Sequence, residues 1–134
     1  MTRSVASDEA ASGRRPEGYR RPRAARLRTA REIRRTIRAG RSSRGRIVDV
    51  FFAPSTAGRS RIGVVTPRHG RGAVARNLVR RRLTEIARIH VLPALEARRL
   101  DLDLVVRAKP AAYDASYERL RATLMDSLET VCAG

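Results

Sequence analysis

Residues 71–83 of the chain, RGAVARNLVRRRL, contain five arginines and no acidic residue. Alanine, valine and leucine separate the arginines at helical spacing, so the segment predicts a folded helix rather than a charged tail. Guanidinium groups bind phosphate oxygens through paired hydrogen bonds and stack on flat rings. The chemistry that these residue types and this spacing indicate is therefore the binding of phosphate groups.

Residues that could make or break covalent bonds are few. The two histidines, His69 and His90, are far apart in the sequence, and each is predicted to be structural. Neither a His/Cys pattern typical of zinc nor a glycine-rich nucleotide loop is present. Asp101 and Asp103 lie at the start of an expected strand, where solvated carboxylates are common. We expect no catalytic residue in the protein and no metal ion bound tightly by it.

The net charge of +17 over 134 residues is unevenly distributed. Residues 1–22 carry five arginines and three acids, whereas residues 23–82 carry eighteen arginines and two acids, Glu32 and Asp49. The remaining residues, 83–134, carry seven basic and eight acidic side chains. A compact domain with such excess charge repels itself unless a polyanion neutralises it. The distribution favours a nucleic acid as partner, with an anionic membrane surface as the second candidate.

Length and composition indicate one domain with a short N-terminal arm. Residues 1–22 lack periodicity and are rich in Ser, Gly, Pro and charge, so we expect a disordered arm followed by a domain at 23–134. The single cysteine, Cys132, fits a reducing compartment. No apolar run approaches the ~20 residues of a membrane span, and no apolar secretory segment opens the chain. We expect a cytoplasmic protein without membrane contact.

The first half of the domain predicts one helix and two strands. Thr29 and Glu32 form a capping box that opens a helix over 29–39. β-branched and aromatic residues predict strands at 46–53 and 60–66. The short loop between these strands predicts that they pair antiparallel.

The second half predicts two helices around a third strand. Residues 73–92 predict a long amphipathic helix, residues 102–107 a strand, and residues 115–131 a last helix with Asp114 as its N-cap. The core side of the long helix carries Ala75, Val79, Leu83 and Ile86. Its other face carries Arg76, Asn77, Arg80, Arg81, Thr84 and Arg88. We expect this face to continue into Arg68, His69 and Arg71, with Phe51 as a stacking surface for an unpaired base or as a core residue.

The ordered features of this region resemble one known family, the protein component of bacterial ribonuclease P. The segment RIGVVTPRHGRGAVARNLVRRRLTE contains the family's leading Arg61-Ile62-Gly63 and its central pattern, Ala73-Val74-x-Arg76-Asn77-x-x-Arg80-Arg81. The segments DLVVRAKPAA and ARLRTAREIRRTIRAGRSSRGR resemble the family's late strand and opening helix. The resemblance covers roughly residues 23–131.

Four positions depart from the family pattern. Leu78 stands where a third basic residue usually follows the Arg-Asn pair. The basic pair after the second strand is Arg68-His69, and Gly70-Arg71-Gly72 replaces the usual glycine and its neighbour. Ile33 and Ile37 stand where the opening helix often presents aromatic residues toward the leader cleft.

The resemblance implies an α+β fold with a leading helix, a mostly antiparallel sheet of about four strands, a long basic helix and a C-terminal helix. It also implies a left-handed βαβ crossover, against the usual right-handed rule. The implied function is that of the protein subunit of ribonuclease P, which removes the 5′ leader of precursor tRNA. The RNA subunit would perform catalysis with bound Mg²⁺, and the protein would be a monomer when free.

The resemblance also implies two sets of site residues. The RNA-binding set is Arg61, Arg68, His69, Arg71, Arg76, Asn77, Arg80, Arg81 and Thr84. The leader cleft would contain Phe51, Ile33 and Ile37.

Three other functions compete with this hypothesis. The strongest alternative is a ribosomal or ribosome-assembly protein that binds ribosomal RNA. A DNA-binding domain would need more base-reading side chains than the one amide among the arginines of the long helix. A protein-only nuclease would need a cluster of metal-binding carboxylates, and residues 23–82 contain only two acids.

Overall fold

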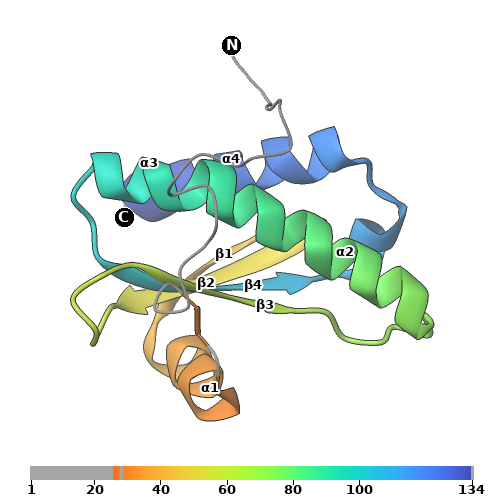
Figure 1. Ribbon diagram of the computed structural model, residues 1–134, viewed down its shortest axis with the longest axis horizontal. Helices are drawn as coiled ribbons and strands as arrows, with labels where there is room; N and C mark the ends of the chain where they lie inside the picture. The colour runs from red at the N-terminus through yellow and green to blue at the C-terminus, as the bar shows by residue number, and fades with distance from the viewer. Residues whose placement is uncertain (1–25, 28, 134) are drawn as a thin grey trace, which may run out of the picture.

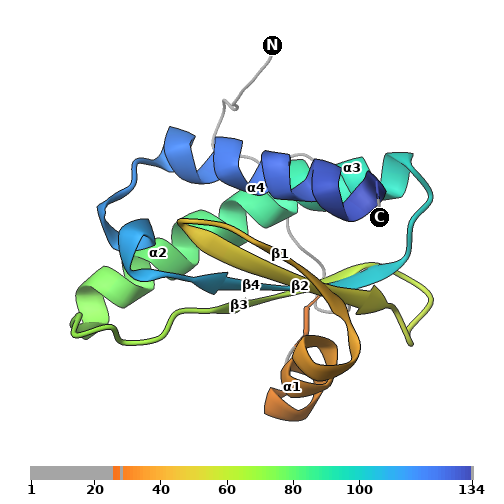
Figure 2. The ribbon, with the colours of Figure 1, turned by 180° about the vertical axis from the view of Figure 1, so that it is seen from behind.

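The computed structural model describes residues 26, 27 and 29–133. The arm expected at 1–22 therefore lies outside the described residues. The described chain forms a four-stranded sheet with helices on both faces (Figures 1 and 2). The helices are α1 (Ala30–Ala39), α2 (Ala73–Ile86), α3 (Leu92–Ala97) and α4 (Tyr117–Ala133), with a π-helical turn η2 (Ala87–Val91) and a 3-10 turn η3 (Pro110–Asp114). The strands are β1 (Arg41–Arg44), β2 (Val48–Pro54), β3 (Arg61–Val65) and β4 (Leu102–Ala108).

The strand order is β1-β2-β4-β3, with β1–β2 and β2–β4 antiparallel and β3–β4 parallel. The α+β class and the mostly antiparallel sheet are thereby confirmed. The expected antiparallel pairing of β2 with β3 is wrong, because β4 lies between them. The central residues Leu104, Val105 and Val106 of β4 are buried on both faces, and only a central position in the sheet provides that burial.

Strand β1 was not predicted from the sequence. Its residues, RSSR, are polar and mostly exposed, as befits an edge strand that has one neighbour and little core to fill. The connection from β3 through α2 and α3 to β4 is a parallel crossover. Its left-handed sense stays a prediction from the resemblance.

The sheet separates two hydrophobic clusters. The larger contains Val48, Val50 and Phe52 of β2 together with α2, α3 and α4. The smaller contains Leu27, Phe51 and Val105, with Ile33, Ile37 and Val65 packed against them. Helix α1 therefore covers the opposite face of the sheet from the other helices (Figures 1 and 2). Successive side chains of β2 point to opposite faces of the sheet, with Val50 and Phe52 in the larger cluster and Phe51 in the smaller.

Helix α1 begins as predicted. The Thr29 hydroxyl accepts from the Glu32 backbone N–H at 3.1 Å, and the Glu32 carboxylate accepts from the Thr29 N–H at 3.4 Å. The helix packs closely on the sheet over Gly63, where an added Cβ would lie only 3.2 Å from the Leu27 Cβ and 3.3 Å from an Ile33 side-chain carbon. Glycine at this position therefore lets α1 approach β3.

The helix predicted over 73–92 is divided in the structure, since α2 ends at Ile86. Val79, Leu83 and Ile86 of α2 are buried, which confirms its predicted core side. Beyond Ile86 the chain continues through the π turn η2 into α3, with Pro93 in the first turn of α3. Proline has no N–H to donate, and the start of a helix requires none, so Pro93 permits a new helix to begin after the π turn.

The start of α4 differs from the prediction. The Ser116 hydroxyl accepts from the Arg119 backbone N–H at 3.1 Å and so caps the helix. The expected cap, Asp114, instead lies at the end of η3 and forms an ion pair with Arg71 at 3.2 Å. Within the described part of the chain, no helix is long and apolar enough to cross a membrane.

Candidate nucleic-acid interface

The outer face of α2 is basic and carries little counter-charge. Asn77, Arg80 and Arg81 are exposed, and Arg76 and Thr84 are half-buried. The first turn contains no acid, and the only acid of the helix, Glu85, lies 3.6 Å from Arg88. The structure therefore brings five predicted residues onto one helix, which presents guanidinium groups toward solvent.

Two arginines of α2, Arg76 and Arg80, differ in how the protein holds them. The Arg80 Nη2 donates to the Thr66 hydroxyl at 2.8 Å, which directs its guanidinium along the end of β3. The Nε of Arg76 is buried and has no hydrogen-bond partner among the described residues. A groove between β3 and α2 has Arg26, Arg80 and Thr84 at its rim. The Arg80 guanidinium is therefore oriented before any partner binds.

The loop that precedes α2 is anchored to η3. The Tyr113 hydroxyl donates to the Pro67 carbonyl, and the Arg71 guanidinium lies over the Tyr113 ring at 5.2 Å from its centre. His69 has a positive φ of 46°, and its Nε2 lies 3.2 Å from the Ala108 carbonyl oxygen. Arg68 and His69 are exposed beside the basic helix, so the loop extends the α2 face as predicted.

Arg61 is placed differently from the other predicted RNA-binding residues. Its side chain is 10% exposed, and its Nε and Nη2 each donate to the Asp103 carboxylate at 2.9 Å. It also donates to Glu32 at 3.1 Å and to the Thr56 hydroxyl at 3.2 Å. These carboxylates raise the pKa of Arg61, with the Asp103 hydrogen bonds as the main cause. A direct phosphate contact by Arg61 would require this network to open, so the placement argues against one.

Asp103, the carboxylate at the centre of this network, was expected from the sequence to be solvated, and its structural role was not predicted. Asp103 is fully buried and also accepts from Arg35 of α1 at 3.1 Å. Strands β3 and β4 place Asp103 directly beside Arg61 in the parallel register. Opposite charges at matched strand positions were the available signal, but it depends on knowing that β3 pairs with β4.

Phe51 lies on the α1 face of the sheet and is 3% exposed. The guanidinium carbons of Arg44 and Arg107 lie 5.5 and 4.8 Å from its ring centre. Ile33 and Ile37 pack against the same cluster from α1, so the structure brings the three predicted cleft residues together. The two arginines that border Phe51 were not predicted, because the pairing that positions them depends on β1 and on the tertiary register.

The positive charges of Arg107 and Lys109 are partly neutralised by one carboxylate, that of Asp49. The Asp49 carboxylate lies 3.4 Å from Arg107 and 3.8 Å from Lys109, and its other contact is the Gly45 N–H at 3.2 Å. Two cations therefore share one carboxylate. Arg44, Arg107, Ile33 and Ile37 surround Phe51, and we call this region the Phe51 surface. It remains electropositive because one carboxylate serves two cations.

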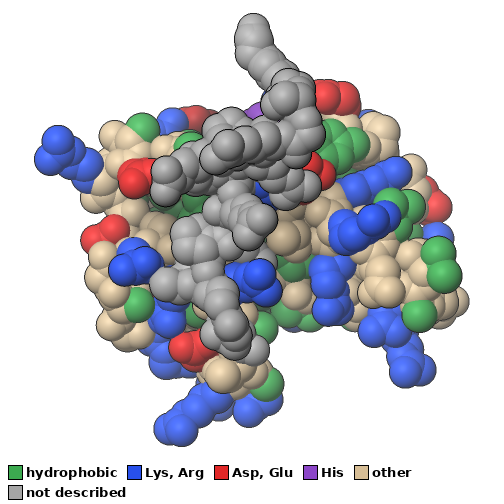
Figure 3. Space-filling model, viewed as in Figure 1, with side chains coloured by type: hydrophobic (Ala, Val, Ile, Leu, Met, Phe, Trp, Pro, Cys, Tyr) green, Lys and Arg blue, Asp and Glu red, His purple; other side chains and the backbone are tan. Residues whose placement is uncertain are grey.

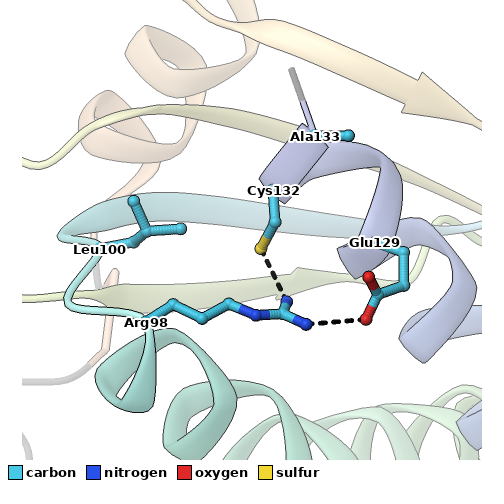
Figure 4. Close-up of a pocket in the computed structure, with 5 residues that line it drawn as sticks. All are labelled: Arg98, Leu100, Glu129, Cys132 and Ala133. Carbon is cyan, nitrogen blue, oxygen red and sulfur yellow. Dashed lines mark hydrogen bonds and ion pairs between the residues drawn. The ribbon is translucent and has the colours of Figure 1, made fainter.

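A cavity of about 430 Å³ between α3 and α4 belongs to a different part of the molecule (Figure 4). The Arg98 guanidinium donates to Glu129 at 2.8 Å and to the Cys132 sulfur at 2.9 Å. These hydrogen bonds raise the pKa of Arg98, with Glu129 as the larger cause. These hydrogen bonds link the end of α3 to α4 and leave the polar groups of the three side chains paired with one another. We therefore assign the cavity a structural role.

The basic α2 face, its anchored loop and the electropositive Phe51 surface define a small α+β protein built to bind RNA. The sequence model of the Ribonuclease P family matches residues 22–132. The chain is 38% identical over 106 residues to the ribonuclease P protein component of Pseudarthrobacter chlorophenolicus, covering 78% of this chain and 75% of that protein. It is 40% identical over 101 residues to the corresponding protein of Acidothermus cellulolyticus, covering 72% and 79%.

Solved structures show the same fold. The ribonuclease P protein of Staphylococcus aureus superimposes with a TM-score of 0.70 at 22% identity, covering 81% of this chain and 96% of that one. The protein of Thermotoga maritima gives 0.67 at 24% identity, covering 78% and 96%.

The chain belongs to the ribonuclease P protein family. Its function is that of the protein subunit of ribonuclease P, in tRNA processing, and it associates with the RNA subunit of that endoribonuclease. None of these comparisons supports the ribosomal alternative.

Proposed function

We propose that the outer face of α2 binds the RNA subunit and that the Phe51 surface binds the 5′ leader of precursor tRNA. In this proposal the RNA subunit, with its Mg²⁺, cleaves the phosphodiester bond, and the protein supplies no catalytic group. No protein side chain is assigned to the ion. The free protein is a monomer and acts in the cytoplasm.

The observation that carries the proposal is the uncompensated basic face of α2. Arg76 and Arg81 form no ion pair within the described chain, and Arg80 is oriented by a neutral hydroxyl. A phosphate backbone would supply the missing counter-charge and release its own condensed counterions. The buried Nε–H of Arg76, which lacks a hydrogen-bond partner among the described residues, would gain an acceptor if an oxygen atom of the RNA reached it.

Electrostatics also give the protein a role at low Mg²⁺. Two RNA molecules repel each other when the leader of the substrate approaches the RNA subunit. Arginines between them reduce that repulsion, and Mg²⁺ performs the same screening when the protein is absent. The protein should therefore lower the Mg²⁺ concentration that cleavage requires.

The support for leader binding is the combination of cations and apolar groups at one place. Arg44 and Arg107 lie over the Phe51 ring, and Ile33 and Ile37 close the surface from α1. Single-stranded nucleic acid is bound by this combination, because phosphates contact cations and bases contact flat or apolar surfaces. Since Phe51 is nearly covered, the arginine planes would provide the outermost stacking surface.

The test is cleavage of the 5′ leader of a precursor tRNA by a bacterial ribonuclease P RNA at low Mg²⁺, with and without this protein. We expect strong stimulation by the protein and no cleavage by the protein alone. A variant carrying Arg76→Gln, Arg80→Gln and Arg81→Gln should stimulate far less. The matched control, Arg59→Gln, Arg99→Gln and Arg119→Gln, removes the same charge from exposed positions elsewhere and should stimulate normally. Tight RNA binding without stimulation would refute the proposal.

A further inference from the structure

The outer face of α1 carries a row of three arginines that neither site uses. Arg31, Arg34 and Arg38 are exposed and recur at intervals of three and four residues. At 100° per residue, their side chains lie within about 60° of one another around the helix axis. We call these three residues the α1 arginine row. The opposite side of the helix, with Ile33, Thr36 and Ile37, contacts the sheet.

The α1 arginine row has no counter-charge in the described protein. The other two charged residues of α1, Glu32 and Arg35, are drawn into the network around Arg61 and Asp103. None of the ion pairs of the described chain includes a member of the row. Like charges three and four residues apart destabilise a helix on their own. The row is therefore a site of excess positive charge that an external polyanion would neutralise.

Its position separates it from the α2 face. Helix α1 lies on one face of the sheet, and α2 lies on the other (Figures 1 and 2). Lys and Arg side chains project at the lower edge of the molecule, over α1 (Figure 3). An RNA segment seated on α2 would have to pass around the sheet to contact this row. The same helix, however, forms one wall of the Phe51 surface through Ile33 and Ile37.

We propose that the α1 arginine row binds backbone phosphates of the 5′ leader, beyond the nucleotides held at the Phe51 surface. This inference rests on the proposed function. Arg31 and Arg38 are separated by about 10 Å along the helix axis, which is enough for about two or three consecutive phosphates of one strand. Arginines without a neighbouring aromatic ring or amide contact phosphate without reading base identity, so the contact should depend on leader length and not on leader sequence.

The test uses the reconstituted holoenzyme and precursor tRNAs with leaders of about 4 and about 16 nucleotides, the range that single-strand-binding domains cover. The variant is Arg31→Gln, Arg34→Gln, Arg38→Gln, and the control is Arg59→Gln, Arg99→Gln, Arg119→Gln. We expect the variant to lose affinity for the long leader alone, while the control binds both as the wild type does. Circular dichroism verifies that α1 remains folded.

The salt dependence gives a second readout. Three phosphate contacts to a single strand contribute about 2 to the slope of log K against log salt. Affinity of the wild type for the long leader should therefore fall about 20-fold more than that of the variant between about 50 and 200 mM salt. Affinity for the RNA subunit, measured separately, should be the same for both proteins.

Three results would overturn the inference. These are equal losses on both leaders, no loss on either leader, or a loss of affinity for the RNA subunit in place of the leader. In each of these cases the wild-type protein would still stimulate cleavage at low Mg²⁺, and the proposed function would stand. Failure of the wild type to stimulate either substrate would instead refute the proposed function itself.

Discussion

Removing the charge of Asp103 should destabilise the protein more than removing any surface ion pair. The Asp103 side chain is fully buried and accepts three hydrogen bonds, two from Arg61 and one from Arg35, at 2.9 to 3.1 Å. In an Asp103→Asn variant, the buried Arg61 guanidinium would retain one nearby acid, Glu32, whose side chain is 36% exposed. The substitution leaves a buried cation without its main partner.

The magnitude follows from that burial. Breaking one side of a buried ion pair costs about 3–5 kcal/mol. The asparagine amide of the variant would keep one acceptor oxygen, so we expect a loss near the lower limit, about 3 kcal/mol in the free energy of unfolding. For a domain of this size, that corresponds to a fall of about 10–15 °C in Tm. The Arg35 side chain is 39% exposed, so Arg35→Met should cost no more than about 1 kcal/mol.

Urea unfolding followed by circular dichroism measures both variants against the wild type. Because Asp103 joins α1, β3 and β4, the loss should appear in the midpoint of a single transition with an unchanged m-value. A loss below about 1 kcal/mol for Asp103→Asn would refute the reasoning. A loss for Arg35→Met as large as that for Asp103→Asn would also refute it, because exposure would then not control the cost.

Three other predictions concern single residues. Arg76→Ala and Arg80→Ala should each weaken assembly with the RNA subunit by about 1–3 kcal/mol, measured by filter binding, and wild-type affinity in both would contradict the assignment. Phe51→Ala should lower stability by about 3–5 kcal/mol because the ring is buried, whereas the milder Phe51→Leu should weaken leader binding more than assembly; equal losses in both assays would assign Phe51 to the core alone. Burial, and then Arg121, lower the pKa of His90. The unfolded chain should therefore take up a proton at higher pH than the folded protein, so stability should fall as pH drops below about 6.5, and His90→Gln should reduce that fall; an identical pH profile in urea unfolding would disprove it.

Local sequence patterns predicted helices α1, α2 and α4 and strands β2, β3 and β4, but not α3 or β1. The capping box joins Thr29 and Glu32, which are three residues apart, so it depends on the local sequence and not on the tertiary fold. The core stripe of α2 follows from helical periodicity in the same way. The excess charge between residues 23 and 82 predicted a polyanionic partner, because composition does not depend on how the chain is folded.

Strand pairing was decided at long range. The loop between β2 and β3 suggested a hairpin, but burial of β4 on both of its faces required the central position. That same pairing places Asp103 beside Arg61, and so converts an expected phosphate ligand into part of an internal network. No local pattern at Arg61 distinguishes these two roles, because the residue's partner is 42 positions away in the sequence.

The sequence by itself determined that the protein is basic, that one helix concentrates arginines on its outer face, and which family it belongs to. Each of these three features depends on residue identity and on the spacing of residues that are close together in the sequence. Only the tertiary structure decided which arginines are available. Burial and ion pairing remove Arg61 from the surface. Strand pairing brings Arg44 and Arg107 over Phe51. The α1 arginine row stays exposed on the opposite side of the sheet from α2. The physical reason is that a buried guanidinium held by protein carboxylates, as Arg61 is, has little exposed surface and few free donors to offer RNA.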